Sequence, residues 1–133
     1  MIERISINTS KKLQLIDVTS LVESALRNSY GAYNGVLLCY VPHTTAAITI
    51  NEAADPDVAL DIESFLKLHL PEGIKFRHLE GNSDAHVIST LIGSSVIVPV
   101  ENGSLKLGRW QGIFFVEADG PRVRNINIVK LTS

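Results

Sequence analysis

The chain has few of the features that mark several classes of protein. Cys39 is the only cysteine among 133 residues, so an internal disulfide and a cysteine-based zinc site are excluded. It lies in the apolar run 36–41, where a small buried thiol is expected. No apolar run approaches the roughly 18 residues of a membrane span, and no basic segment leads into an apolar one after Met1. We therefore expect a cytoplasmic protein.

An excess of charge of one sign is also lacking. Twelve Lys and Arg residues are matched by fourteen Asp and Glu residues, which gives a formal net charge of −2. Proteins that bind duplex nucleic acids draw much of their affinity from clustered positive charge. We therefore expect neither a nucleic-acid nor a membrane partner. A local phosphate pocket needs only one or two well-placed donors and is compatible with this balance.

The apolar pattern predicts a single α+β domain over residues 1–133. Helical spacing of apolar residues indicates about three helices, near residues 20–29, after Asp55-Pro56 and after 82–84. Alternating or continuous apolar runs indicate strands at 4–8, 13–16, 36–41, 45–51, 95–100, 105–107, 110–116 and 123–131. The first two are expected to form a hairpin, and Asn102-Gly103 is a second hairpin signal. The expected architecture is a sandwich-like arrangement of antiparallel sheets.

The histidines are the main candidates for chemistry, and their positions differ. His69 continues the apolar stripe that includes Phe65 on the second helix, so we expect a packed histidine there. His86 lies in the first turn of the third helix and groups with Ser89 and Thr90, away from the apolar face. The helix N-terminus favours a neutral imidazole, the state that a metal ligand or a general base needs. A solvated surface histidine explains His86 equally well.

Two more histidines lie near polar segments. His43 comes just before the alternating strand 45–51 and falls on its polar face if the strand is continuous. His78 and His86 bracket Asp84 and a second carboxylate within nine residues. Mixed histidine and carboxylate ligands suit zinc and several other divalent metals. A solvated loop accounts for this spacing about as well.

Two further groups lie near the end of the chain. Trp110 stands beside Gln111 and between glycines, where a packed tryptophan is expected rather than ligand stacking. Glu117 precedes a turn that is followed by Arg122 and Arg124. A loop with surface ion pairs explains this stretch, and a phosphate or carboxylate clamp formed by the two arginines is the alternative.

Several segments, taken in this order and spacing, resemble the YjbQ-like family over nearly the whole chain. The segments that carry the resemblance are Pro42-His43-Thr44-Thr45-Ala46-Ala47, Asn51-Glu52 with Asp55-Pro56-Asp57, Asn82-Ser83-Asp84-Ala85-His86, Gly103-Ser104-Leu105-Lys106-Leu107-Gly108-Arg109-Trp110-Gln111, Glu117 and Asp119-Gly120-Pro121-Arg122.

The resemblance implies an α+β fold built on antiparallel sheets and a homotrimer whose sites lie near subunit boundaries. It also implies that a set of polar residues gathers, around a divalent ion where one is bound: His43, His78, His86, Asn82, Asp84 and Glu117. The family carries the tentative name secondary thiamine-phosphate synthase. That reaction joins a pyrimidine methyl pyrophosphate to a thiazole phosphate and releases pyrophosphate.

The function that we expect is that of a metal-dependent enzyme acting on a small phosphorylated substrate, with thiamine phosphate synthesis as the named reaction. Hydrolysis by a zinc-bound water fits three histidines equally well. The alternative is a non-catalytic homotrimer that binds a metal or a small ligand. The expected roles are metal ligands for zinc or a similar ion (His43, His78, His86), proton transfer (Asp84, Glu117) and substrate binding (Asn82, Gln111, Arg122, Arg124).

Overall fold

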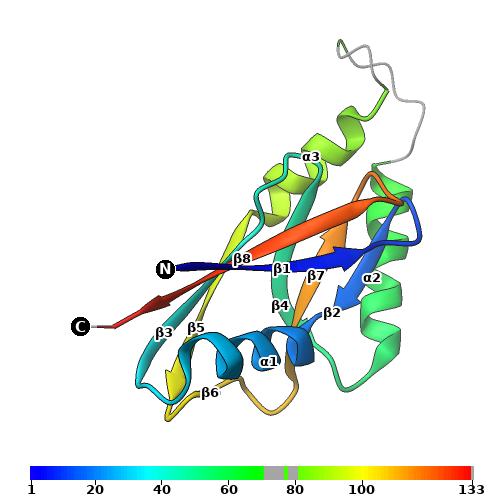
Figure 1. Cartoon of the computed structure of the whole chain (residues 1–133). Coiled ribbons are helices and arrows are strands. Elements are labelled where there is room, and N and C mark those ends of the chain that lie inside the picture. The colour runs from blue at the N-terminus through cyan, green and yellow to red at the C-terminus, as the bar shows by residue number, and fades with distance from the viewer. Residues whose placement is uncertain (71–76, 78–80, 133) are drawn as a thin grey trace.

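The computed structural model describes residues 1–70, 77 and 81–132. These residues form an α+β domain, as expected (Figure 1). The helices are α1 (Thr19–Tyr30), α2 (Pro56–His69) and α3 (Ser83–Ile92). The strands are β1 (Ile2–Asn8), β2 (Gln14–Asp17), β3 (Gly35–Tyr40), β4 (Ala46–Glu52), β5 (Ser95–Glu101), β6 (Ser104–Leu105), β7 (Gln111–Glu117) and β8 (Val123–Leu131). Within the described part, no helix combines the length and apolarity needed to cross a bilayer.

The described strands make two antiparallel sheets. The larger sheet has the order β1-β8-β3-β5-β6, and the smaller sheet has the order β2-β7-β4. The predicted hairpin at Asn102-Gly103 is confirmed: both residues have positive φ angles, and β5 pairs with β6 across them. The apolar alternation therefore located the strands, but their division between sheets needs the structure.

The predicted hairpin between the first two strands is wrong. β1 pairs with β8 and β2 pairs with β7, so the chain passes from one sheet to the other between them. The crossing segment is bound to the turn between β7 and β8: Thr9 N donates to Arg122 O at 3.0 Å, and Gly120 N donates to Lys12 O at 3.1 Å. At Gly120 a Cβ atom would lie 2.4 Å from Lys11 O, so this close approach requires a glycine.

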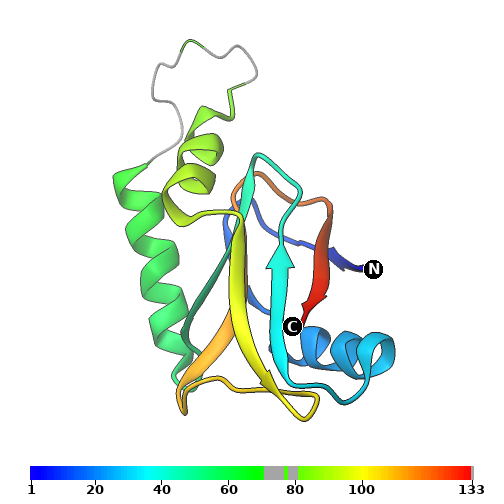
Figure 2. The same cartoon turned by 90° about the vertical axis from the view of Figure 1, so that its left-hand side faces the viewer.

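The smaller sheet lies between the larger sheet on one side and the helices α2 and α3 on the other (Figure 2). Apolar side chains pack on both of its faces. The main core lies between the two sheets and α1, and it includes Phe115, Leu26, Leu37 and Cys39. Burial raises the pKa of the Cys39 thiol to about 12, in agreement with the expected inert thiol. The second core lies between the smaller sheet and the helices α2 and α3; its buried members are Ala47, Leu66, Ala85, Ile88, Val116 and Ala118. The middle of β7, Ile113 to Val116, is apolar because it is covered on both faces.

Three side chains that were expected to pack are exposed, namely Phe65, His69 and Trp110, and so is Leu91 on α3. The exposed fractions are 61% for Phe65, 68% for Leu91 and 54% for Trp110, and His69 is also exposed, with its ring 4.2 Å from that of Phe65. α2 and α3 each pack against the three-stranded sheet with one face only, so apolar residues outside that face remain exposed to solvent. Trp110 instead lies under the guanidinium of Arg109, 4.6 Å from the ring centre.

Replacement of Phe115 by alanine tests the main core. Phe115 is fully buried, so Phe115→Ala should lower the free energy of unfolding by about 3–5 kcal/mol. Phe65→Ala is the matched control, because Phe65 is mostly exposed and its loss should change stability by less than about 0.5 kcal/mol. Urea denaturation followed by circular dichroism measures both. Similar losses in the two variants would contradict this placement of the core.

Candidate functional site

A fully buried ion pair joins the ends of β7 and β8. Arg124 donates from Nε to Glu117 Oε1 at 2.8 Å and from Nη2 to Oε2 at 2.5 Å. Their side chains are 4% and 0% exposed. Thr9 Oγ1 and Asp119 N donate to the same carboxylate at 2.7 and 3.0 Å, and Arg124 Nη2 also donates to Thr45 Oγ1 at 2.8 Å. The predicted surface ion pair is therefore wrong for Glu117 and Arg124, because buried β7 carries Glu117 into the interior.

The environment of Glu117 favours its charged form. Burial alone would raise the pKa of this carboxyl, but hydrogen bonds from Arg124, Thr9 and the Asp119 amide, together with the charge of Arg124, bring the pKa below its ordinary value. Glu117 is thus ionised at neutral pH, and its charge is balanced by Arg124. Both carboxylate oxygens already accept hydrogen bonds within the protein.

His43 lies between β3 and β4 and is bound by the residue that follows Arg124. Its Nε2 accepts a hydrogen bond from the backbone N–H of Asn125 at 2.9 Å. A ring turned by 180° would present a C–H group to that amide. With the Nε2 lone pair used in this way, the neutral ring carries its proton on Nδ1.

The surroundings also keep His43 neutral. Burial lowers the pKa of His43, and the positive charges of Arg124 and Arg122 lower it further, while Glu117 partly opposes them. Neutral His43 therefore offers a ligand one hydrogen-bond donor, Nδ1–H.

His43 and His86 line the same hollow, which has a volume of about 670 Å³. We call it the histidine hollow; its other polar residues are Tyr40, Thr44, Ser89, Thr90 and Ser94. The grouping of His86 with Ser89 and Thr90, predicted from helical spacing, is confirmed. Ser89 Oγ donates to Ala46 O at 2.8 Å and so ties α3 to β4 beside the hollow.

Asp84 faces a different hollow. It lies two residues before His86, which places the two side chains on opposite sides of α3. Its Oδ2 accepts a hydrogen bond from Lys12 Nζ at 2.5 Å. The second hollow, which we call the lysine hollow, is lined by Lys11, Lys12 and Lys67 together with Asp84. The structure thus separates Asp84 from His43 and His86, two of the three histidines that it was expected to accompany.

Of the predicted substrate-binding residues, Asn82 and Arg122 lie together and Gln111 lies apart from them. Asn82 Nδ2 and Arg122 Nη2 both donate to Asp119 Oδ2 at 3.0 Å, and these three residues form a partly exposed cluster at the turn after β7. Gln111 lies at the other end of β7, about 20 Å from Glu117 along an extended strand. Its side-chain oxygen accepts from Gly108 N at 2.8 Å and closes a local turn.

The described residues give limited support to a metal site. Residues 1–70, 77 and 81–132 contain no group of three or more His, Cys, Asp or Glu side chains placed to hold a metal. His78 lies outside the described residues, so the three-histidine site stays a prediction. As held here, His43 does not fit as a metal ligand, because its Nε2 already accepts a hydrogen bond from the Asn125 N–H. A metal bound to Nδ1 would place the proton of the neutral ring on Nε2, where it would point at that N–H, or would require an imidazolate.

The comparisons with known proteins decide the family. The profile of the family described as UPF0047 protein YjbQ-like matches residues 3–133. The chain belongs to this family. The fold expected from the resemblance is confirmed by a solved structure, the hypothetical protein APE1520 from Aeropyrum pernix K1, with a TM-score of 0.92 and 41% identity over 100% of this chain and 99% of that one.

Curated relatives in the YjbQ-like family match along almost their whole length. UPF0047 protein MJ1081 of Methanocaldococcus jannaschii is 48% identical over 96% of this chain and 92% of its own. UPF0047 protein YugU of Bacillus subtilis is 48% identical over 96% of this chain and 97% of its own. These names state no activity, so the function must be argued from the site.

Sequence reasoning missed several partners of the site. Thr9 and Thr45 contact the Glu117–Arg124 pair, and Lys12 contacts Asp84, although each pair is far apart in the sequence. The Asn125 amide that binds His43 has no sequence signal, because any residue except proline supplies a backbone N–H.

Glu117→Gln tests the buried pair through the pH dependence of stability. Because its pKa in the folded chain is below the ordinary 4.5, Glu117 stabilises the fold above that pH and loses this contribution as the pH falls through the folded value. At neutral pH we expect Glu117→Gln to cost about 3–5 kcal/mol, since it leaves Arg124 buried without a counter-charge. Urea unfolding from pH 7 to pH 3 should show the difference from wild type shrinking.

Glu101→Gln is the control for that measurement. Glu101 is an exposed carboxylate at the end of β5, and its replacement should change stability little at any pH. A loss for Glu117→Gln that is independent of pH would contradict an ionised Glu117 in the folded chain.

Proposed function

We propose that this protein is an enzyme that acts on a small phosphorylated substrate in the histidine hollow. The observation that carries the proposal is the state of His43: neutral, with Nε2 held by Asn125 and Nδ1–H left as a donor beside Arg124 and Arg122. A second imidazole, His86, lines the same hollow. A fixed donor aimed at an oxyanion is a common means of stabilising charge that develops in a reaction.

The lining of the histidine hollow supports a phosphorylated substrate. Phosphoryl oxygens accept hydrogen bonds, and the hollow offers the imidazole N–H together with hydroxyl groups of Thr44 and Ser94. Arg122 does not line the hollow, but its charge acts on His43. It is half exposed and is oriented by Asp119, to which it donates from Nη2 at 3.0 Å and from Nε at 2.9 Å. A guanidinium held in this way is suited to phosphate recognition.

The proposal divides the roles as follows. His43 donates a hydrogen bond from Nδ1 to an anionic oxygen of the substrate. His86 acts as the general acid or base that exchanges a proton with the reacting group of the substrate. Glu117 orients Arg124, since the carboxylate is fully buried and both of its oxygens are already bonded. Asp84 pairs with Lys12 on the other side of α3. Thiamine phosphate synthesis is the first reaction of this class to test.

The second candidate is a non-catalytic homotrimer that binds a small ligand in the same place. One observation favours assembly: Tyr40 and Ile97, on neighbouring strands of the larger sheet, are 44% and 60% exposed. Tyr40 also lines the histidine hollow. An assembly that covers these side chains would bring a neighbouring chain to the edge of the hollow, in keeping with the site near subunit boundaries that the family resemblance implies.

The catalytic proposal is tested by assaying thiamine phosphate formation with wild type, His43→Asn and His86→Asn. Loss of a proton-transfer or oxyanion-binding group should lower kcat by about a hundredfold or more. His69→Asn is the matched control, because His69 is an exposed histidine on α2. Equal rates in all four proteins would overturn the assignment of the site.

The same assay after treatment with EDTA tests whether a metal takes part. Unchanged rates would indicate that the imidazoles act without a metal. Loss of activity that added zinc restores would return His43, His78 and His86 to the role of metal ligands. Binding of the substrates without turnover would favour the non-catalytic candidate.

The predicted assembly is tested by light scattering. We expect a mass three times the 14.5 kDa of one chain, and Ile97→Lys should shift it toward the monomer because it places a charge on the exposed apolar face. Leu68→Lys, at a 75% exposed position on α2, is the control and should leave the mass unchanged. A monomeric wild type would contradict the homotrimer.

A further inference from the structure

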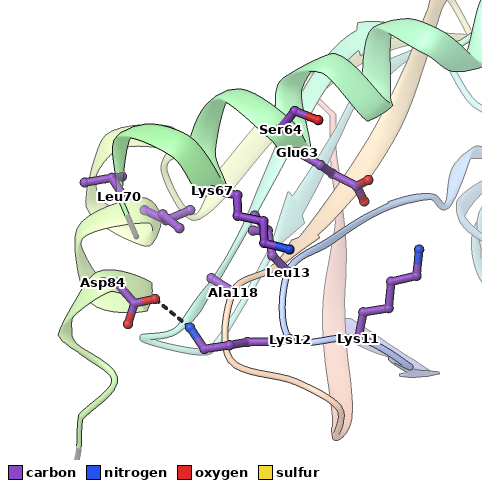
Figure 3. A pocket seen from close by; sticks show the side chains of 10 residues that line it. Lys11, Lys12, Leu13, Glu63, Ser64, Lys67, Leu70, Asp84 and Ala118 are labelled. Atoms are coloured by element: carbon purple, nitrogen blue, oxygen red, sulfur yellow. Dashed lines mark hydrogen bonds and ion pairs between the residues drawn. The ribbon is translucent and has the colours of Figure 1, made fainter. Parts of the chain in front are cut away.

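The lysine hollow has a volume of about 660 Å³ and lies between α2, α3 and the segment that joins β1 to β2 (Figure 3). Lys67 extends from α2, and Lys11 and Lys12 come from the segment that faces it. The volume lies within the range of about 300–1,000 Å³ that is usual for small-molecule sites. Neither the Glu117–Arg124 pair nor the histidines contribute to its lining.

The base of the lysine hollow is apolar. Leu13, Leu70 and Ile88 line it, and all three belong to the second core or pack against it. The hollow therefore combines an apolar base with a cationic rim. Water solvates these apolar side chains poorly, so a ligand whose apolar part covers them binds with a more favourable free energy.

The acidic groups of the lysine hollow are already bonded to the protein. Asp84 accepts from Lys12 at 2.5 Å, and Glu63 Oε1 accepts from the backbone N–H of Leu15 at 2.8 Å. Within the part of the chain that the structure describes, the ammonium groups of Lys11 and Lys67 make no hydrogen bond or ion pair. Three lysines and two carboxylates, Glu63 and Asp84, line the hollow, so its formal net charge is +1. This net charge lies at the mouth of an apolar concavity and focuses a positive potential there.

We propose that the lysine hollow binds a small organic anion that carries an apolar body. Its acidic group, a carboxylate or a phosphate, lies between Lys11 and Lys67, and its apolar part rests on Leu13, Leu70 and Ile88. This site is independent of the proposed reaction, since α3 separates it from the histidine hollow. Ile88 and Asp84 face the lysine hollow, whereas His86 faces the other side.

The proposal is tested by calorimetric titration with four probes. 1-Naphthyl phosphate and 1-naphthoate combine an anionic group with an apolar body, 1-naphthol lacks the charge, and inorganic phosphate lacks the body. We expect the two naphthyl anions to bind more tightly than 1-naphthol or phosphate, and their affinity to fall as salt is added. Their relative affinity identifies the preferred acidic group. Equal binding of 1-naphthol and the naphthyl anions would overturn the proposal.

Substitution of the lysines that line the hollow shows where the naphthyl anions bind. Lys67→Met and Lys11→Met keep a long apolar side chain but remove the charge, and each should weaken binding of the anions about fivefold, the upper range for one exposed ion pair. The double variant should weaken it further, with 1-naphthol unaffected. Lys106→Met, an exposed lysine beyond β6, is the matched control. These lysines are at least partly exposed, so the variants should fold, which circular dichroism checks.

His43→Asn separates this proposal from the proposed function. Binding of the naphthyl anions should be unchanged in His43→Asn, whatever that variant does to turnover. Loss of binding in His43→Asn with no loss in Lys67→Met would place the probe in the histidine hollow and overturn the proposal.

Discussion

The buried contact between Glu117 and Arg124 is the constraint on which the two sheets depend. β7 belongs to the smaller sheet and β8 to the larger one, so the pair lies where the chain passes between them. An ion buried without a partner costs several kcal/mol. The surrounding segments must therefore reach the pair: Thr9 follows β1, and Thr45 precedes β4. The polar contact thus adds a specific alignment of four segments to the register that apolar packing sets.

The same constraint determines the state of His43. Once Arg124 is fixed by Glu117, the next backbone amide in β8 is that of Asn125, and its N–H points at the imidazole. The ring is then oriented and carries its proton on Nδ1, while burial and the nearby guanidinium charges lower its pKa. A buried pair that never contacts the hollow thus prepares the one donor on which the proposed chemistry rests.

α3 divides the polar surface of the protein into two parts. In a helix, residues two apart point to opposite sides, whereas residues three and four apart share a face. His86, Ser89 and Thr90 therefore line the histidine hollow, while Asp84 and Ile88 line the lysine hollow. The two hollows differ in charge and in lining, so they are suited to different ligands, although one short helix contributes to both.

The sequence by itself determined the features that depend on neighbouring residues. The helices, most strand positions, the Asn102-Gly103 turn and the grouping of His86 with Ser89 and Thr90 follow from local periodicity and turn chemistry. The tertiary structure decided the rest: which strands pair, which helix face is buried, and which charges are paired. The His43–Asn125 and Lys12–Asp84 contacts join residues 82 and 72 positions apart. No local pattern encodes such contacts, because they form only when the sheets and helices pack together.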